Sequence, residues 1–174
     1  MYEYGSVCLR RGVAGDIAAI EKIVGAVVPL MRGAGNFQWG PDYPRGEHFL
    51  RDAELGQLWV AEDKDVPGTV VGVGALTEDQ GEDYKQIWDI SQVAVVPHRV
   101  CVAPEARGKG AAKAFMLHAQ QLSRDRGYKS VRVDTNSVNA AMHHIFDSLG
   151  YKFLGNLELA GREGMVFHAF EKLL

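Results

Sequence analysis

The sequence contains few cysteines, no long apolar run and no excess of positive charge. Its two cysteines, Cys8 and Cys101, cannot build the disulfide framework of a small secreted protein, so we expect a cytoplasmic location. No apolar run reaches the roughly 18 residues that a membrane helix needs, because the longest one, Ile17 to Met31, contains Glu21 and Lys22. The N-terminal residues lack the basic-then-apolar order of a signal peptide. We therefore expect no contact with a membrane.

Positive charge is scarce overall but locally concentrated. Nineteen Lys and Arg residues against 22 Asp and Glu residues give a net charge of −3 with neutral His, so we expect no nucleic-acid partner. The segment Pro104 to Arg132 nevertheless carries seven basic and two acidic residues, a local charge of +5 that leaves −8 for the rest. This asymmetry indicates a local anionic ligand, although a solvated helix face would have the same composition.

The length suits a single domain over residues 1–174. Apolar residues recur every three or four positions in the expected helices Ile17–Met31, Arg45–Leu55, Gly108–Arg126 and Asn139–Leu149. The expected strands are Val7–Arg10, Leu58–Glu62, Thr69–Thr77, Val93–Val102, Lys129–Asp134, Lys152–Leu159 and Met165–Leu173. This order predicts an α/β (α+β) protein with a mixed, mostly antiparallel sheet of six to seven strands and about four flanking helices.

Three local signals refine this outline. Asp16 is expected to cap the first helix, and Pro29 with Gly33 and Gly35 is expected to end or kink it. Pro97 cannot donate a hydrogen bond to a neighbouring strand, so the strand around it is expected to bulge or splay at that residue.

The strongest signal for chemistry is the glycine-rich turn VAPEARGKGAA between a strand and a helix. A helix start presents unpaired N–H groups and the positive end of the helix dipole. Gly108 and Gly110 allow a phosphate close to the backbone, and Arg107, Lys109 and Lys113 add positive charge. We therefore expect a pyrophosphate ligand. A Walker A loop and the dinucleotide fingerprint GxGxxG both fail, the latter because Lys113 occupies the third glycine position.

The turn does fit Arg-x-x-Gly-x-Ala, Arg107 to Ala112, which resembles the pyrophosphate motif of the GNAT superfamily of acyl-CoA N-acyltransferases. HRVCVAPEARGKGAAKAFM resembles that family's fourth strand and following helix, and VRVDTNSVNAAMHHIFDSLGY resembles its fifth strand and fourth helix. A loop motif of uncharacterised bacterial members, N-x-QW…YP, is matched by Asn36, Gln38, Trp39, Tyr43 and Pro44. The resemblance covers nearly the whole chain and implies the GNAT fold, with its sheet splayed at the fourth strand.

The resemblance also implies acetyl-CoA as cosubstrate, and no metal. The cofactor-binding residues that it implies are Val100, Cys101, Val102, Arg107, Gly108, Lys109, Gly110, Ala111, Ala112 and Asn139. The strand residues would bind the pantetheine arm and polarise the thioester carbonyl through their main chain, and the turn would hold the pyrophosphate. Gln38, Trp39 and Tyr43 would line the acceptor pocket, although anchoring the loop by packing is an equally good interpretation for Trp39 and Tyr43.

The implied reaction is direct attack of a primary amine, on a small molecule or a peptide, on the acetyl thioester. His98 is the candidate base, because it alternates in phase with Val100 and Val102 and imidazole titrates near neutral pH. Locking the bulge beside Pro97 is the alternative role for His98. Four carboxylates near the strands, ranked below His98, could instead pass a proton through water: Glu78, Glu82, Asp83 and Asp89. Cys101, on the opposite strand face, is interpreted as a small buried residue and not a nucleophile.

One position departs from the family pattern. Many members place a tyrosine on the fourth helix as the acid that protonates the leaving thiolate, and this chain has Phe146 there. A thiol pKa near 8.5 makes the thiolate a tolerable leaving group. The sequence therefore leaves open an active transferase and a catalytically weak or inactive acyl-CoA-binding protein.

Three further points concern the rest of the chain. A nucleotide-binding protein is a third alternative for the function, and the formation of a homodimer is left open. Asp134 is interpreted as pinning the end of its strand.

Overall fold

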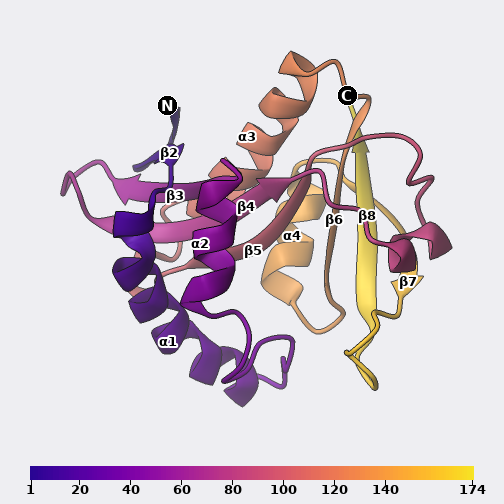
Figure 1. Cartoon of the computed structure of the whole chain (residues 1–174), viewed down its shortest axis with the longest axis horizontal. Helices are drawn as coiled ribbons and strands as arrows, with labels where there is room; N and C mark the ends of the chain where they lie inside the picture. Colours follow the sequence, from indigo (N-terminus) through magenta and orange to yellow (C-terminus); the bar gives the residue numbers. More distant parts are fainter.

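The computed structural model describes residues 1–174 and places eight strands in two antiparallel sheets (Figure 1). The five-stranded sheet has the order β1-β2-β3-β4-β5, formed by Tyr2–Tyr4, Val7–Arg11, Leu58–Asp63, Val70–Thr77 and Val96–Val102. The three-stranded sheet has the order β6-β8-β7, formed by Ser130–Asn136, Phe167–Leu173 and Lys152–Leu157. The predicted α+β class is confirmed. The eighth strand is β1, which is three residues long and too short to show a hydrophobic pattern.

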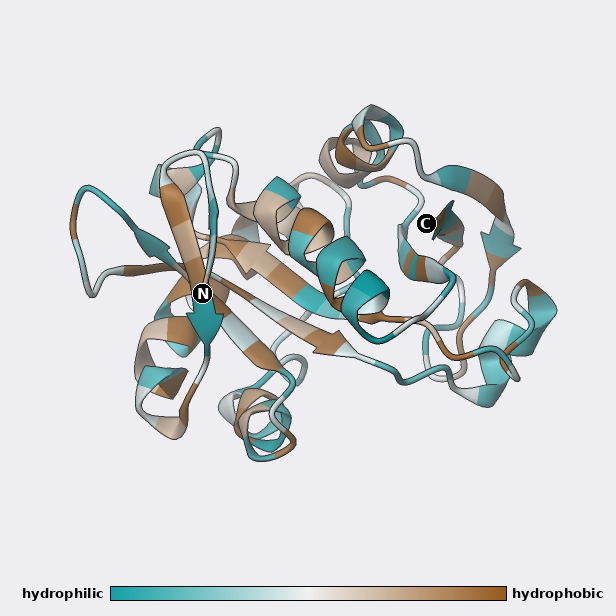
Figure 2. Cartoon of the chain, turned by 90° about the horizontal axis from the view of Figure 1, so that it is seen from above, coloured by the Kyte–Doolittle hydropathy of each residue, from teal (hydrophilic) through white to brown (hydrophobic).

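Four helices flank the sheets, as the apolar periodicity predicts. They are α1 (Ile17–Gly33), α2 (Gly46–Glu54), α3 (Ala111–Asp125) and α4 (Ala140–Ser148), with short 3₁₀ turns η1 (Ala14–Asp16), η2 (Glu82–Gln86) and η3 (Pro104–Ala106). Helices α1 and α2 cover one face of the five-stranded sheet and α3 covers the other (Figure 2), where the strands are largely hydrophobic. None of the helices combines the length and the apolar character that crossing a membrane requires.

Glycines in β4 let α3 approach the sheet closely. A Cβ atom on Gly74 would lie 3.1 Å from the Phe115 ring, and one on Gly72 would lie 3.5 Å from it. Phe115 is fully buried against this glycine strip. The close contact packs α3 directly against β4.

Two expectations about the ends of α1 are confirmed only in part. Asp16 occupies the N-cap position, but its side chain accepts a hydrogen bond from the Val13 N–H (2.9 Å) and pairs with Arg10, and makes no capping bond to α1. The helix continues through Pro29 and ends at Gly33, one of the residues expected to end or kink it.

The bulge in β5 lies two residues beyond Pro97. Pro97 pairs with Leu76 in regular register, whereas Arg99 and Val100 together face Gly74, and Arg99 has a positive φ of 53°. Cross-strand partners point to the same face and alternate along a strand. His98 pairs with Ala75, and Val102 pairs with Gly72. Ala75 and Gly72 are three positions apart on β4, so they lie on opposite faces of the sheet. The expected phase is therefore wrong: the extra residue puts His98 on the face opposite Val102.

The same register also corrects the placement of Cys101. Cys101 pairs with Val73, two positions from Ala75, so it lies on the same face of the sheet as His98 and not on the opposite one. It is buried, as expected.

The two sheets separate where β5 and β6 run side by side. They touch through the parallel bridge Val95–Val131 and a hydrogen bond of 3.1 Å from the Arg132 N–H to the Val95 carbonyl, and they share no ladder beyond it. β5 is an edge strand of the five-stranded sheet and β6 is an edge strand of the three-stranded sheet (Figure 1). The expected splay at this strand is therefore present, and it divides one expected sheet into two.

Candidate active site

A cavity of about 740 Å³ opens where β5 and β6 diverge. Its walls come from β5, the turn before α3, the start of α3, β6, α4 and the segment between α1 and α2. At one end lies the glycine-rich turn, and at the other a group of polar side chains. The cavity is large enough for a ligand that reaches from one end to the other.

The turn presents five backbone N–H groups that have no hydrogen-bond acceptor within the protein. They belong to Gly108, Gly110, Ala111, Ala112 and Lys113, and all five residues line the cavity. Gly108 and Gly110 have positive φ values of 80° and 91°, a conformation that strains any residue with a side chain. Unpaired N–H groups at a helix start form an anion site, so the predicted phosphate cradle has the geometry that it needs.

The basic side chains of the turn do not all serve this site. Arg107 and Lys113 line the cavity. Lys109 does not: its ammonium pairs with Asp63 at 2.7 Å, and its N–H donates to the Ala106 carbonyl. The structure thus separates Lys109, expected beside the pyrophosphate, from the cavity and gives it a contact with the end of β3.

The main chain of β5 faces the cavity along the splayed edge. The Ala103 N–H donates to the Val71 carbonyl at 2.9 Å, on the side of β4. Because N–H groups alternate in direction along a strand, the Val102 N–H points to the opposite side, where β5 has no partner strand. Val100, Cys101 and Val102 all line the cavity. The Cys101 side chain is buried, and burial raises the pKa of its thiol to about 12, so it is no nucleophile near neutral pH.

Two residues border the cavity at α4: Asn139, which is the N-cap of the helix, and Phe146, which lies within it. Asn139 caps the helix by accepting from the Met142 N–H, and its amide donates to the Thr135 hydroxyl at 3.0 Å. Phe146 is fully buried and packs against Phe170, with ring centroids 4.9 Å apart. The residue in place of the family's tyrosine is therefore part of the core.

The predicted acceptor loop closes the other end of the cavity. Gln38, Trp39 and Tyr43 all line it. Trp39 is 4% exposed and belongs to the main hydrophobic core, and the Gln38 side chain accepts a hydrogen bond from the Asn136 N–H at 3.2 Å. These residues both bound the cavity and fix the loop to β6.

His98 lies in the cavity wall with a defined tautomer. Its Nε2 is 3.3 Å from the backbone carbonyl oxygen of Asp79. A carbonyl can only accept, so Nε2 carries the hydrogen and Nδ1 keeps its lone pair. His98 can therefore take up a proton through Nδ1.

Asp134 and Tyr84 form a second polar pair, which the sequence interpretation missed. The Tyr84 hydroxyl donates to Asp134 Oδ1 at 2.8 Å, and both residues line the cavity. Burial raises the pKa of Asp134, while the charge of His98 and the Tyr84 hydrogen bond act in the opposite direction. Asp134 is the one acidic side chain in the cavity wall. The interpretation of Asp134 as a residue that pins the end of its strand therefore leaves out its place in the cavity wall.

Two arginines also reach this end. Arg99 makes two hydrogen bonds to Asp52, of 2.6 and 2.8 Å, and donates to the Tyr43 hydroxyl. Arg162 lies over the Tyr43 ring, with its guanidinium carbon 4.7 Å from the centroid, and donates to the Gln38 carbonyl. Arg99 lies within the segment that resembles the family's fourth strand, but the sequence analysis gave it no role, and Arg162 belongs to no motif.

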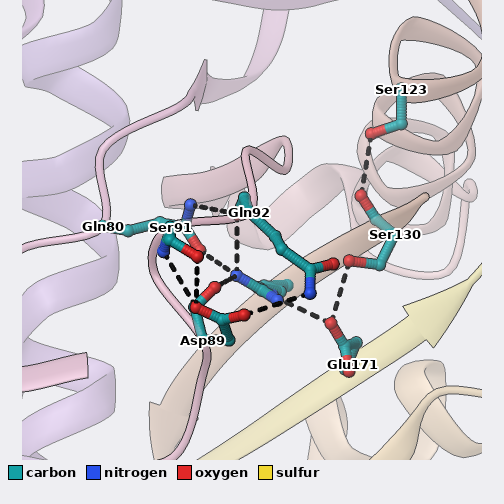
Figure 3. Close-up of polar contacts among 8 residues, drawn as sticks. Gln80, Asp89, Ser91, Gln92, Ser123, Ser130 and Glu171 are labelled. Carbon is teal, nitrogen blue, oxygen red and sulfur yellow. Dashed lines mark hydrogen bonds and ion pairs between the residues drawn. The ribbon is translucent and has the colours of Figure 1, made fainter. Parts of the chain in front are cut away.

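Arg132 holds the segment that carries Tyr84. It is 4% exposed, pairs with Glu171 at 2.8 Å and donates to the carbonyls of Asp89 and Gln92, each at 3.0 Å. Figure 3 shows the loop residues Gln80, Asp89 and Gln92 gathered on one side and Ser130 with Glu171 on the other. Arg132 and Asp134 are two positions apart on β6 and so share a face. Through Arg132 and Asp134, this face of β6 holds the segment of residues 80–92, which contains η2, at two places.

Comparison with known proteins identifies the family. Residues 54–153 match the acetyltransferase (GNAT) domain, which is more than half of the chain. The chain therefore belongs to the GNAT acetyltransferase family, and the predicted resemblance is confirmed.

Individual relatives agree with this assignment. Human N-acetyltransferase 8B is 36% identical over 102 residues, which are 56% of this chain and 39% of that protein. N-acetylaspartate synthetase of Xenopus tropicalis is 29% identical over 116 residues, or 67% of this chain and 38% of that protein. The chain thus spans about two fifths of the length of these curated relatives.

Solved structures share the fold over the whole chain. A GNAT acetyltransferase from Streptococcus agalactiae has a TM-score of 0.83 at 24% identity, covering 100% of this chain and 99% of its own. The protein yncA from Salmonella typhimurium, solved with its cofactor acetyl-CoA, has a TM-score of 0.69 at 20% identity, covering 97% and 94%. At these identities the likeness establishes the fold.

Proposed function

We propose that residues 1–174 form one domain of an acetyl-CoA-dependent N-acetyltransferase that acts on a primary amine of a small molecule or peptide, in the cytoplasm. The observation that carries the proposal is one cavity that joins five unpaired N–H groups at the start of α3 to the polar group around His98. The solved structure of yncA with acetyl-CoA supports the choice of cofactor. The basic charge around the turn suits a pyrophosphate.

The cofactor-binding residues fall into three groups. The N–H groups of Gly108, Gly110, Ala111 and Ala112 would hold the pyrophosphate, with Arg107 beside them. The main chain of Val100, Cys101 and Val102 would bind the pantetheine arm. Lys109 would contribute through its place in the turn only, and Asn139 through the cavity wall that it stabilises.

The Val102 N–H also has a role in the reaction itself. Because it points to the open side of β5, it can donate to the oxygen on which negative charge develops when the amine attacks the thioester. A fixed backbone donor of this kind needs no reorganisation during the step.

His98 is the proposed base. The amine must lose a proton to form the new N–C bond, and Nδ1 of His98 is free to accept it. Asp134, whose charge acts on His98, would stabilise the imidazolium that results. The C–S bond then breaks and the sulfur leaves as thiolate, which Phe146 cannot protonate.

The alternative is an acyl-CoA-binding protein of the same fold with weak or no turnover, and the burial of Phe146 in place of an acid favours it. An amine panel with acetyl-CoA separates the two. Release of free CoA thiol, together with an acetylated product detected by mass spectrometry, supports the transferase. Binding of acetyl-CoA by calorimetry with no product from any amine supports the alternative.

A further inference from the structure

The acceptor end of the cavity holds one carboxylate and one unpaired guanidinium. Four Lys and Arg side chains line the cavity: Arg99, Arg107, Lys113 and Arg162. Arg107 and Lys113 belong to the phosphate end, and Arg99 is neutralised by two hydrogen bonds to Asp52. Arg162 has no carboxylate within 4.0 Å. It is therefore the one Lys or Arg side chain at this end of the cavity that is not paired with a carboxylate.

The neighbours of Arg162 fix its position without using its charge. One N–H donates to the Gln38 carbonyl, and the plane of the group lies against Tyr43. A guanidinium has five N–H donors, and this is the one hydrogen bond that its side chain makes. The remaining donors form a rigid fork that matches a carboxylate.

The charge of Arg162 also acts on Asp134, whose carboxyl lies across the same end of the cavity. A simple amine enters as an ammonium ion, and Arg162 repels it. A carboxylate on the acceptor removes that repulsion, because it neutralises Arg162 while the ammonium faces Asp134. The nearby walls are apolar, formed by Leu159, Phe167 and the Tyr43 ring.

We propose, on the basis of the proposed function, that the acceptor is a free amino acid with an apolar side chain, whose carboxylate binds Arg162 and whose amino group lies between Asp134 and His98. Arg162 is then a specificity-determining residue. A peptide N-terminus and a plain alkylamine are poorer acceptors, because neither brings a carboxylate next to its amine.

The test compares three acceptors that differ only at the carboxylate: phenylalanine, phenylalaninamide and 2-phenylethylamine, with the corresponding sets for leucine and methionine. The wild-type protein with saturating acetyl-CoA is expected to show a kcat/KM for the amino acid that exceeds the other two by about ten- to a hundredfold. In Arg162→Met this ratio falls towards one, and Arg162→Lys retains part of it. The ratio of kcat/KM values is the readout, because a general loosening of the loop would lower kcat/KM for all three acceptors alike.

Three outcomes would overturn the proposal. The first is equal or better acetylation of the amide or the amine, and the second is a preference that survives in Arg162→Met. The third is no acetylation of any set by protein that binds acetyl-CoA in a calorimetric titration, which rejects the amino-acid class and leaves the cofactor site standing. A protein that does not bind acetyl-CoA at all rejects the proposed function itself.

Discussion

The Tyr84 hydroxyl donates a hydrogen bond of 2.8 Å to Asp134 Oδ1, joining two residues 50 positions apart in the sequence. The bond connects the η2 turn to β6 at the acceptor end of the cavity. A hydrogen bond to a carboxylate favours its charged form, so Tyr84 opposes the effect of burial on Asp134.

Replacement of Tyr84 by Phe is expected to shift the pH dependence of activity. Without the hydroxyl, the pKa of Asp134, already raised by burial, rises further. If the Asp134 carboxylate supports the base, the acid limb of the kcat/KM profile moves to higher pH. The measurement is a pH–rate profile of the wild type and Tyr84→Phe. An acid limb that stays in place or moves to lower pH contradicts the assigned role of Asp134.

Replacement of His98 by Gln is expected to remove the base while keeping the cofactor site. The kcat should fall by about 10²- to 10⁴-fold, the range typical of general base catalysis, with unchanged affinity for acetyl-CoA. His144→Gln is the matched control, because His144 is exposed and does not line the cavity. Equal kcat values for His98→Gln and the control would return His98 to its alternative role beside the β5 bulge.

The local parts of this account could be predicted from the sequence, and the long-range parts could not. Apolar periodicity located all four helices, and the glycine-rich turn predicted its own anion site, because both signals lie within one segment. The bulge depends on how β5 meets β4, so Pro97 pointed only near it, and the phase of His98 was wrong as a result. Asp134 and Tyr84 meet through tertiary packing. Their one sequence signal is the pair Arg132 and Asp134, two charges on the same face of a buried strand.

Replacement of Arg132 by Met is expected to cost stability and activity together. Removal of the guanidinium leaves the Glu171 carboxylate without its cationic partner and takes one of two donors from each loop carbonyl, because the Asp89 carbonyl keeps the Gln92 N–H and the Gln92 carbonyl keeps the Gln80 amide. Loss of this buried pair should cost about 3 kcal/mol of unfolding free energy. The segment of residues 80–92, which contains η2 and Tyr84, then loses its contacts with Arg132, so kcat/KM should also fall. Urea unfolding and steady-state kinetics measure the two effects.

Lys85→Met serves as the control for Arg132, since it removes an exposed ion pair with Glu82 from the same segment and should change stability by less than about 1 kcal/mol. If Arg132→Met is as stable and as active as this control, Arg132 does not hold the segment.

The pH dependence of stability is expected to contain a contribution from His118. Its ring lies between Tyr2 and Trp59, with centroids at 4.9 and 4.1 Å, and burial lowers its pKa to about 4. The unfolded chain takes up this proton near pH 6.5, so the stability contribution is complete above about pH 6.5 and is lost as the pH falls towards about 4.

His118→Phe tests this contribution, because it removes the titrating group and keeps an aromatic ring in the same place. Urea unfolding across this pH range should show a dependence reduced by about one proton relative to the wild type, while His144→Gln should not differ from it. An unchanged pH dependence in His118→Phe would contradict a neutral, buried His118.

Acetyl-CoA binding at the glycine-rich turn is best tested by a calorimetric titration with acetyl-CoA, with ATP and NAD as competing ligands. We expect micromolar binding of acetyl-CoA alone, weakened about tenfold in Arg107→Gln, whose side chain lines the cavity. Lys109→Gln should bind as the wild type does, because its ammonium pairs with Asp63 outside the cavity. No binding of acetyl-CoA by folded wild-type protein, or displacement of it by ATP or NAD, would contradict an acetyl-CoA site at this turn.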